Sequence, residues 1–359
     1  MIGVVDHAGR RLRLLAGLDD LDAQAFLITR LPNVRYLTGF SGSNGQLILT
    51  AQDGVFLTDG RYAVQSGREV PGLTRQIYSG DMVPPIARTL AGLVLKRVAF
   101  ESGDMTYKTY SAFLSAGIEL LPAADLVESL RWVKEPAEVE CLDAAQSIAD
   151  QAFEVITAKL AEGITEKEAA LELDTTMRAL GADGLAFDTI MAFGESSAEP
   201  HHNPTDRPLA RGDIVKMDFG CVVSGYHSDM TRTVGFGEVA SRLVDIYEIV
   251  RRAQEAGVRA VRAGVTGGAV DEVTRDIIGE AGYADAYRHG VGHGVGLEIH
   301  EGPSLRSGSG DVLPKGSVVT VEPGIYLDKV GGVRIEDMVE VKADGGRVIP
   351  ATTKDFVVL

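Results

Sequence analysis

Short apolar runs separated by glycine, proline, asparagine and aspartate make up the first third of the chain. Runs of this kind predict β-strands, which we place at residues 25–29, 46–50, 55–57 and 97–100. Apolar residues recur with helical spacing at 85–95 and 106–116, on either side of the last of these strands. The mixture of short strands and helices predicts an α/β domain over residues 1–130.

A polar stretch then leads into a stronger helical pattern. The segment Arg131-Trp-Val-Lys-Glu-Pro136 places a proline where this pattern begins. Proline suits the first turn of a helix, because that turn does not need the N–H that proline lacks. We therefore place a domain boundary at residue 130 and a second domain at residues 131–359.

The second domain contains one succession of elements twice. Each copy has a long helical pattern, a shorter one between two glycines, and a predicted hairpin. The first copy comprises residues 137–161, 163–181 and 214–223 with 226–234; the second comprises 241–263, 264–282 and 317–321 with 333–341. Thr165 and Glu168 form a capping box where the first short helix begins. Because the order is the same in both copies, we predict an internal duplication.

Composition narrows the class of protein. The chain has 359 residues, of which 45% are apolar and 24% are charged, as is typical of a globular protein with room for two domains. Asp and Glu number 51 against 35 Lys and Arg, which gives a net charge of −16. This negative surplus repels phosphate backbones and anionic lipids, so we expect neither nucleic-acid nor membrane binding.

The chain lacks the sequence features of secreted and membrane-spanning proteins. No apolar run approaches the ~20 residues of a membrane span, and the N-terminus lacks the basic-then-apolar order of a secretion signal. We therefore expect a cytoplasmic protein in which Cys141 and Cys221 are free thiols.

Two pairs of carboxylates mark the predicted hairpins. Asp218 and Asp229 lie at equal distances from position 223.5, and Glu322 and Glu336 lie at equal distances from position 329. Residues opposite one another in a hairpin share a face, with Cβ atoms ~4.5–5.5 Å apart, so each pair would repel unless a cation lay between them. Solvent-facing positions are the alternative interpretation, but the flanking residues are mostly apolar, which favours a metal site.

Histidines are concentrated in the same part of the chain. His289, His293 and His300 lie in a run with glycine at 290, 292, 294 and 296. These glycines oppose a helix, so the run is not the helical HExxH motif of zinc proteases. They allow the backbone to approach a ligand closely and let the histidines project from a strand or loop.

The donor set indicates the metal. Four carboxylates and the imidazole of His293 suit Mn²⁺, and Co²⁺ or Zn²⁺ could occupy the same site, whereas a closed thiolate zinc site is excluded. Four carboxylates carry four negative charges, which two divalent ions would match. Two such ions bridged by a hydroxide form a hydrolytic centre.

These residues resemble a known family in order and spacing. Asp218, Asp229, His293, Glu322-Pro-Gly and Val333-Arg-Ile-Glu336-Asp resemble the motifs of the pita-bread metallopeptidases, which include methionine aminopeptidase, aminopeptidase P and prolidase. The resemblance implies an α/β (α+β) fold: a creatinase-like N-terminal α/β domain, as in the proline-directed branch, before a pseudo-twofold duplicated catalytic domain. It also implies that the five residues bind two divalent ions, and that the bond between a residue and a following proline is cleaved.

Further roles are implied by position alone. His201 and His300 look like the substrate-side histidines that stabilise the tetrahedral intermediate, and Glu322 looks like the group that transfers the water proton. His289 resembles a histidine that lines the substrate pocket, and Arg334 matches an arginine that lies beside the last ligand and supports the site. We therefore expect both residues to be on the substrate-binding side of the site. The neighbouring His202 competes with His201, which we favour because it directly follows Pro200.

Substrate length is the open question within this branch. Several prolidases have arginine in a His-Glu-x-Pro-Arg run, whereas this chain has Ser304 there and Arg306 two positions later. We therefore predict an Xaa-Pro aminopeptidase, with an Xaa-Pro dipeptidase (prolidase) as the alternative. The intact ligand set disfavours a non-catalytic peptide-binding homologue and a creatine-type C–N hydrolase. The expected partners are peptides with proline in second position, and the resemblance implies a homodimer or larger homo-oligomer.

Overall fold

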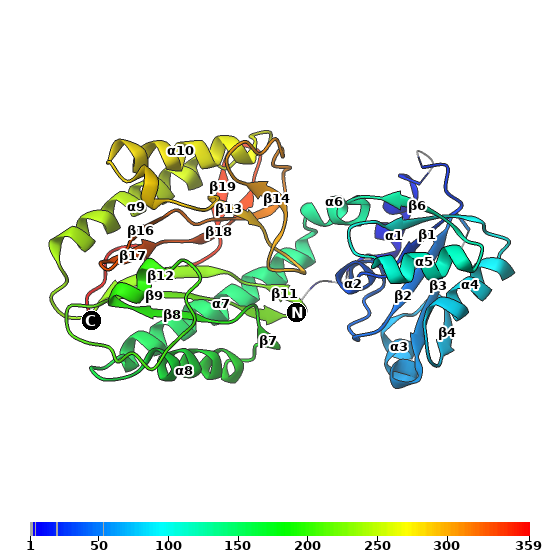
Figure 1. The fold of residues 1–359 in the computed structure, drawn as a ribbon, viewed down its shortest axis with the longest axis horizontal. Coiled ribbons are helices and arrows are strands. Elements are labelled where there is room, and N and C mark those ends of the chain that lie inside the picture. The colour runs from blue at the N-terminus through cyan, green and yellow to red at the C-terminus, as the bar shows by residue number, and fades with distance from the viewer. Residues whose placement is uncertain (1–2, 4, 19–20, 53) are drawn as a thin grey trace. The chain divides into compact units, whose positions relative to one another are not determined.

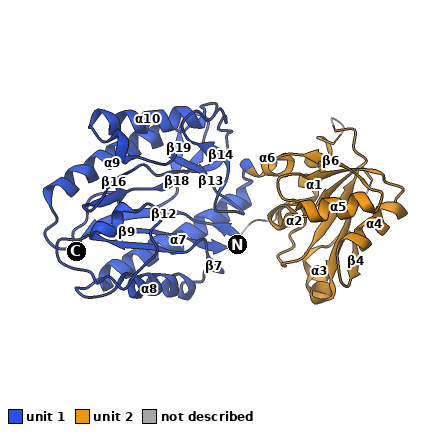
Figure 2. Cartoon of the chain, viewed as in Figure 1, with its two compact units in different colours: residues 1–3, 132–359 blue, residues 4–131 orange. Residues whose placement is uncertain are grey.

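The chain forms two compact units. The computed structural model describes residues 3, 5–18, 21–52 and 54–359. One unit covers Val4–Arg131, and the other covers Trp132–Leu359 together with Gly3 (Figure 2). The division follows Arg131, next to the predicted boundary at residue 130.

The first unit is built on a mixed β-sheet. In the described residues its strand order is β4-β3-β2-β1-β5-β6, in which β1 pairs with β2 and β2 with β3 antiparallel, and the other pairs are parallel. The strands are β1 (Ala25–Ile28), β2 (Gln46–Thr50), β3 (Gly54–Asp59), β4 (Thr74–Tyr78), β5 (Arg97–Glu101) and β6 (Glu119–Ala123). The helices are α1 (His7–Leu15), α2 (Leu31–Thr38), η2 (Gly60–Tyr62), α3 (Ala63–Glu69), α4 (Val83–Gly92), α5 (Tyr107–Ser115) and α6 (Leu126–Trp132).

The burial of their residues explains which of these strands could be predicted from apolar runs in the sequence. Every residue of β1 and β2 is buried, and both strands fall where they were predicted. The two strands at the edges of the sheet were not predicted, because β4 has no buried residue and only two of the five residues of β6 are buried. Apolar runs therefore identified the centre of this sheet and missed its edges.

The second unit contains the predicted duplication (Figure 1). Its first half comprises α7 (Pro136–Lys159), α8 (Glu166–Ala179), β7 (Gly184–Leu185), β8 (Ile190–Phe193), η3 (Gly194–Ala198), β9 (Ile214–Phe219), β10 (Cys221–Val223), β11 (Tyr226–His227) and β12 (Met230–Gly235). Its second half comprises α9 (Ser241–Ala260), α10 (Gly267–Glu280), η4 (Ala284–Ala286), β13 (Gly292–Gly294), β14 (Glu301–Leu305), β15 (Val318–Val321), β16 (Gly324–Leu327), β17 (Gly331–Arg334), β18 (Asp337–Val341) and β19 (Gly346–Val348).

The two halves match in local detail. α7 packs against α8 and α9 against α10. In Figure 1, α8 lies at the lower edge of this unit and α10 at its upper edge. Thr165 caps α8 as the predicted capping box, and Thr266 caps α10. Each of these threonines also forms an antiparallel bridge, with Pro208 and Val312 respectively. The shared caps and bridges show that the repeat extends to the backbone around the helix starts.

One predicted register is wrong by two positions. The first hairpin turns at Ser224-Gly225, both with positive φ, as a two-residue hairpin turn requires. This turn pairs Val223 with Tyr226 and therefore Asp218 with Thr231, not with Asp229. Because side chains alternate with a period of two, Asp229 still shares the face of Asp218.

The second predicted pairing agrees with the observed register. Val321 pairs with Asp337 on one side of the two glutamates, and Gly324 pairs with Arg334 on the other. Glu322 and Glu336 therefore fall opposite each other, in the short break between the two ladders.

Two further observations concern the cysteines and the length and hydropathy of the helices. Cys141 and Cys221 are free and buried, as predicted. Among the described residues, no helix has both the length and the apolar character that crossing a membrane requires.

Candidate active site

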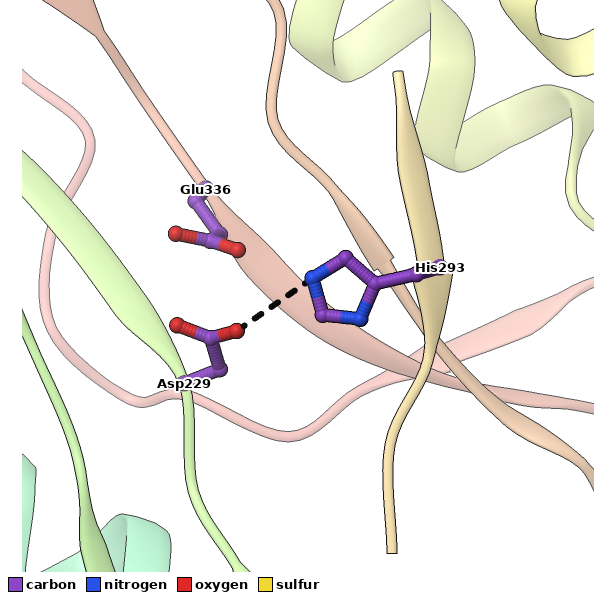
Figure 3. A group of neighbouring side chains, drawn as sticks. All are labelled: Asp229, His293 and Glu336. Atoms are coloured by element: carbon purple, nitrogen blue, oxygen red, sulfur yellow. Dashed lines mark ion pairs between the residues drawn. The ribbon is translucent and has the colours of Figure 1, made fainter. Parts of the chain in front are cut away.

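Three side chains from distant parts of the second unit converge in its interior (Figure 3). Asp229 lies between β11 and β12, His293 lies on β13, and Glu336 lies between β17 and β18. One ligand atom of each lies within 4.8 Å of the others, and His293 Nε2 is 3.6 Å from Asp229 Oδ2. The structure thus brings together a group that could hold a metal ion.

Asp218 and Glu322 complete the predicted set. Glu322 Oε1 lies 3.4 Å from His293 Nε2. Asp218 Oδ1 is buried and has no hydrogen-bond partner. All five residues line one cavity of about 460 Å³. The orphaned oxygen and the crowding of carboxylates fit a site for divalent cations, because carboxylate and imidazole are their usual ligands.

Electrostatics at the cluster are unfavourable without a cation. Burial, and then repulsion from Asp218 and Glu322, raise the pKa of Asp229 well above its usual range. Burial and the neighbouring carboxylates do the same to the pKa of Glu336. The pKa of Glu322 rises to about 7, again mainly through burial. Burial lowers the pKa of His293 to about 4, which keeps the imidazole neutral with a lone pair available for a metal.

The glycines around His293 have a steric cause. A Cβ on Gly292 would lie 2.0 Å from the carbonyl oxygen of Thr320, and one on Gly294 would lie 2.0 Å from that of Gly302. β13 is therefore enclosed on both sides by backbone that only glycine can approach so closely. The close packing of β13 fixes the direction of the His293 side chain.

Arg334 connects the cluster to its surroundings. Its guanidinium is buried and pairs with Asp218. It donates to Pro200 O at 3.1 Å, to Tyr326 Oη at 2.9 Å and to Thr231 Oγ1 at 3.0 Å. Thr231 Oγ1 in turn donates to Glu336 Oε2 at 2.7 Å. Arg334 thereby links two of the carboxylates, and its hydrogen-bonding groups are directed at the protein itself.

The candidate histidines occupy different environments. His201, His289 and His300 all line the cavity. The ring nitrogens of His289 lie 2.8 Å from Gly290 O and 2.8 Å from Tyr326 Oη, so both are engaged within the protein. The ring of His300 stands edge-on to that of His293, with centroids 4.4 Å apart. His201 is exposed to the cavity, and its side chain hydrogen-bonds to none of the described residues.

His202, the competing candidate, is buried and held on both sides. Its Nε2 lies 2.8 Å from Glu166 Oε2, and its Nδ1 lies 2.7 Å from Glu199 Oε2. Glu166 lies at the start of α8, far from the metal cluster in sequence. His202 therefore has its polar atoms occupied, whereas those of His201 are available to a ligand.

Sequence reasoning missed several residues that shape the site. Tyr326 and Thr231 contact Arg334, Lys216 lies buried two positions before Asp218, and Asp188 lines the cavity. Burial lowers the pKa of Lys216 well below its usual range. A charged residue within the apolar run of β9 was the one available signal for Lys216. The other residues carry no such signal, because their partners are distant in the chain.

The raised carboxylate pKa values predict how pH and metal control stability. A carboxyl group with a raised pKa in the folded state favours folding below its ordinary pKa, and this contribution is lost as pH rises through its folded-state value, about 7 for Glu322. Divalent ions compete with those protons and stabilise the fold by binding it. We therefore expect Mn²⁺ to raise the Tm of EDTA-treated protein by several degrees at pH 8 and by much less at pH 5.

Calorimetry at the two pH values, with and without added Mn²⁺, measures this difference. A Tm increase that is equal at both pH values would show that these carboxylates do not compete with protons for the ion.

The fold and the candidate site together define the class of protein to which this chain belongs. A duplicated helix-and-strand unit that gathers acidic residues and one histidine in a single cavity is the architecture of a metal-dependent hydrolase of the pita-bread type. The chain belongs to metallopeptidase family M24, which it matches over residues 140–343, and residues 10–133 match the creatinase/prolidase N-terminal domain. Membership of this family implies divalent metal ions.

Individual relatives support the same placement. The chain is 41% identical to the uncharacterized peptidase YqhT of Bacillus subtilis, over 97% of this chain and 99% of that protein. It superposes on an Xaa-Pro dipeptidase from Bacillus anthracis with a TM-score of 0.96 and 38% identity, over 99% of this chain and 100% of that one. An X-Pro aminopeptidase from Thermotoga maritima gives a TM-score of 0.91 and 34% identity, over 97% of this chain and 99% of that one.

These comparisons confirm the predicted class. The fold is a creatinase-type N-terminal domain followed by an M24 catalytic domain, and the protein is a metallopeptidase, as the resemblance implied. The prediction of a metallo-exopeptidase from the proline-directed branch is confirmed at the level of the family.

Proposed function

We propose that this protein hydrolyses the peptide bond between an N-terminal residue and a following proline. The observation that carries the proposal is the single cavity that holds the five predicted ligands and exposes His201 and His300 beside them. Phe187, Ile190 and Ile299 form an apolar part of the same cavity wall, which suits a pyrrolidine ring. Because prolyl nitrogen carries no N–H in the peptide bond, such a site must select proline by ring shape.

We propose two divalent ions, most readily Mn²⁺, with Asp218, Asp229, His293, Glu322 and Glu336 as their ligands. Buried carboxylates without cations are costly, as the raised pKa values of Asp229, Glu322 and Glu336 indicate, and two divalent ions would balance the charge of the four carboxylates. When bound, these ions lower the pKa of a water and polarise the scissile carbonyl. Arg334 holds Asp218 in place through their ion pair.

The chain's own groups carry the proton and orient the carbonyl. Glu322, with a pKa of about 7 before metal binds, is suited to accept the water proton and to deliver it to the leaving prolyl nitrogen. Burial, followed by the influence of His201, lowers the pKa of His300, so His300 presents one N–H near neutral pH. His201 and His300 are proposed to donate to the carbonyl oxygen as negative charge develops on it.

For substrate length, we propose that dipeptides are the preferred substrates. Arg306 lines the cavity, and its guanidinium forms no hydrogen bond or ion pair with the rest of the described chain. A cation without a protein partner at this place suits the terminal carboxylate of an Xaa-Pro dipeptide. The exposed carboxylate of Asp188, on the same cavity, suits the substrate's α-amino group.

An Xaa-Pro aminopeptidase is the second candidate. Ser304 occupies the position where the resemblance leads us to expect arginine, and it also lines the cavity. The small side chain leaves room for a peptide that continues beyond proline. The Thermotoga maritima relative bears the name X-Pro aminopeptidase.

Substrate length is tested with Ala-Pro and Ala-Pro-Ala on metal-loaded enzyme. We expect higher kcat/KM for Ala-Pro, and we expect Arg306→Gln to raise KM for Ala-Pro by ~10-fold or more, the equivalent of one charge-assisted hydrogen bond. KM for Ala-Pro-Ala should be unchanged by this substitution. The matched control is Arg262→Gln, an exposed arginine after α9.

Two outcomes would point to the aminopeptidase. One is equal or faster turnover of the tripeptide by the wild-type enzyme. The other is an Arg306→Gln variant whose KM for Ala-Pro is unchanged.

A further inference from the structure

His201 lies on a turn whose backbone is held by two buried donors. Lys216 Nζ donates to Glu199 O, and it lies 3.5 Å from Pro200 O. Arg334 Nη1 donates to the same Pro200 O at 3.1 Å. The two carbonyl groups that precede His201 in the chain therefore both accept hydrogen bonds from buried side chains. The side chain of His201 itself is open to the cavity.

The residue immediately after His201 is also fixed by hydrogen bonds. The ring nitrogens of His202 lie between Glu199 and Glu166, at 2.7 Å and 2.8 Å. Glu166 is fully buried and is itself fixed by Phe193 N at 2.9 Å, and by Thr205 N and Oγ1 at 2.9 and 2.6 Å. The turn is thus connected to the start of α8 and to β8.

Apart from its contacts with these carbonyl groups, the amine of Lys216 forms no hydrogen bond or ion pair with the described residues. The side chain of Lys216 leaves β9, whose other residues are apolar except for Asp218. It is fully buried and lies over the ring of Tyr326, with Nζ 5.2 Å from the centroid. It pairs with none of the carboxylates that the structure describes. Burying an amine is costly, and the acceptors it has found are the two carbonyls before His201.

We propose that Lys216 and His202 are positioning residues for His201, which they hold toward the scissile carbonyl. The amine of Lys216 can donate to the carbonyls whether or not it is protonated. Because the geometry of a group acting on the transition state must be held closely, loss of this support should lower kcat more than it raises KM. The proposal rests on the role given above to His201. It adds Lys216, which does not line the cavity, and His202, which lines the cavity but has both ring nitrogens engaged by glutamates.

A double-mutant cycle tests this inference on the metal-loaded enzyme. Lys216→Met should lower kcat by ~10- to 100-fold, with metal content and KM close to wild type. In the His201→Ala background, the same substitution should change kcat by less than ~2-fold, because a positioning residue has no effect once the group it positions is absent. Lys342→Met is the matched control, since Lys342 is half-exposed, does not line the cavity and pairs with Glu340.

A second variant guards against misfolding of Lys216→Met. His202→Leu leaves Glu166 its three other donors, so we expect it to fold and to show the same dependence on His201. His202→Gln, which keeps a donor toward Glu166, should restore part of the lost kcat.

The outcomes separate the two proposals. Equal losses of kcat in the wild-type and His201→Ala backgrounds, an unchanged kcat, or a loss of metal from Lys216→Met would each overturn the positioning role. Full turnover by His201→Ala alone would instead overturn the proposed role of His201.

Discussion

Replacing Asp229 by asparagine is expected to lower kcat/KM at least ~10³-fold, which corresponds to ~4 kcal/mol of transition-state stabilisation. Asp229 lies within the group whose ligand atoms are all within 4.8 Å of one another. The substitution keeps the size of the side chain and removes a negative charge that the proposed divalent ions would balance. Elemental analysis of protein purified without chelator should show less metal per chain, and Glu336→Gln should behave in the same way.

A second signature distinguishes loss of a ligand from general damage. Burial, and then the neighbouring carboxylates, raise the pKa of Asp229, so removing its charge relieves an unfavourable buried charge when no metal is present. We expect the EDTA-treated Asp229→Asn variant to melt at or above the wild-type Tm at pH 8, and to gain little when Mn²⁺ is added.

The control for this result is Asp276→Asn, at an exposed position of α10. It should retain wild-type activity, metal content and Mn²⁺-dependent stabilisation. An Asp229→Asn variant with normal activity and normal metal content would show that the site is misplaced.

Replacing His201 by alanine is expected to give the opposite pattern: metal is retained and turnover is lost. The imidazole is exposed to the cavity and hydrogen-bonds to none of the described residues, so its removal should leave the cluster and the fold intact. Losing one donor to a developing oxyanion costs ~10²- to 10³-fold in kcat, and we expect a decrease of that size.

Metal content and kcat measured on the same preparation decide this case. Loss of metal from His201→Ala would contradict its proposed place on the substrate side of the site. A much larger loss of kcat in His202→Ala than in His201→Ala would exchange the roles of the two histidines.

Local sequence patterns were sufficient for much of the architecture. The helices α7, α8, α9 and α10 lie where apolar periodicity and capping residues predicted them, because those signals act within a few residues. The duplicated order of elements followed from the same signals. Edge strands such as β4 were missed, since their side chains are exposed and carry no apolar run.

The register of the first hairpin shows the limit of spacing arguments. Asp218 and Asp229 were expected to face each other directly, and the turn at Ser224-Gly225 instead pairs Asp218 with Thr231. A register is set by the turn that closes the hairpin. The prediction that the two aspartates lie on the same face of the hairpin was still correct, because a register shift of two positions leaves each side chain on its face.

By itself, the sequence determined most of the elements, their duplication and the chemistry of the proposed ligands, because periodicity and residue type are local properties. The tertiary structure alone decided that His201 is open to the cavity while His202 is held by Glu166 and Glu199. It also decided that the donors of Arg334 and Lys216 are directed at the turn that carries His201. Such contacts join residues far apart in the chain, so they exist only once the two halves of the domain have packed together.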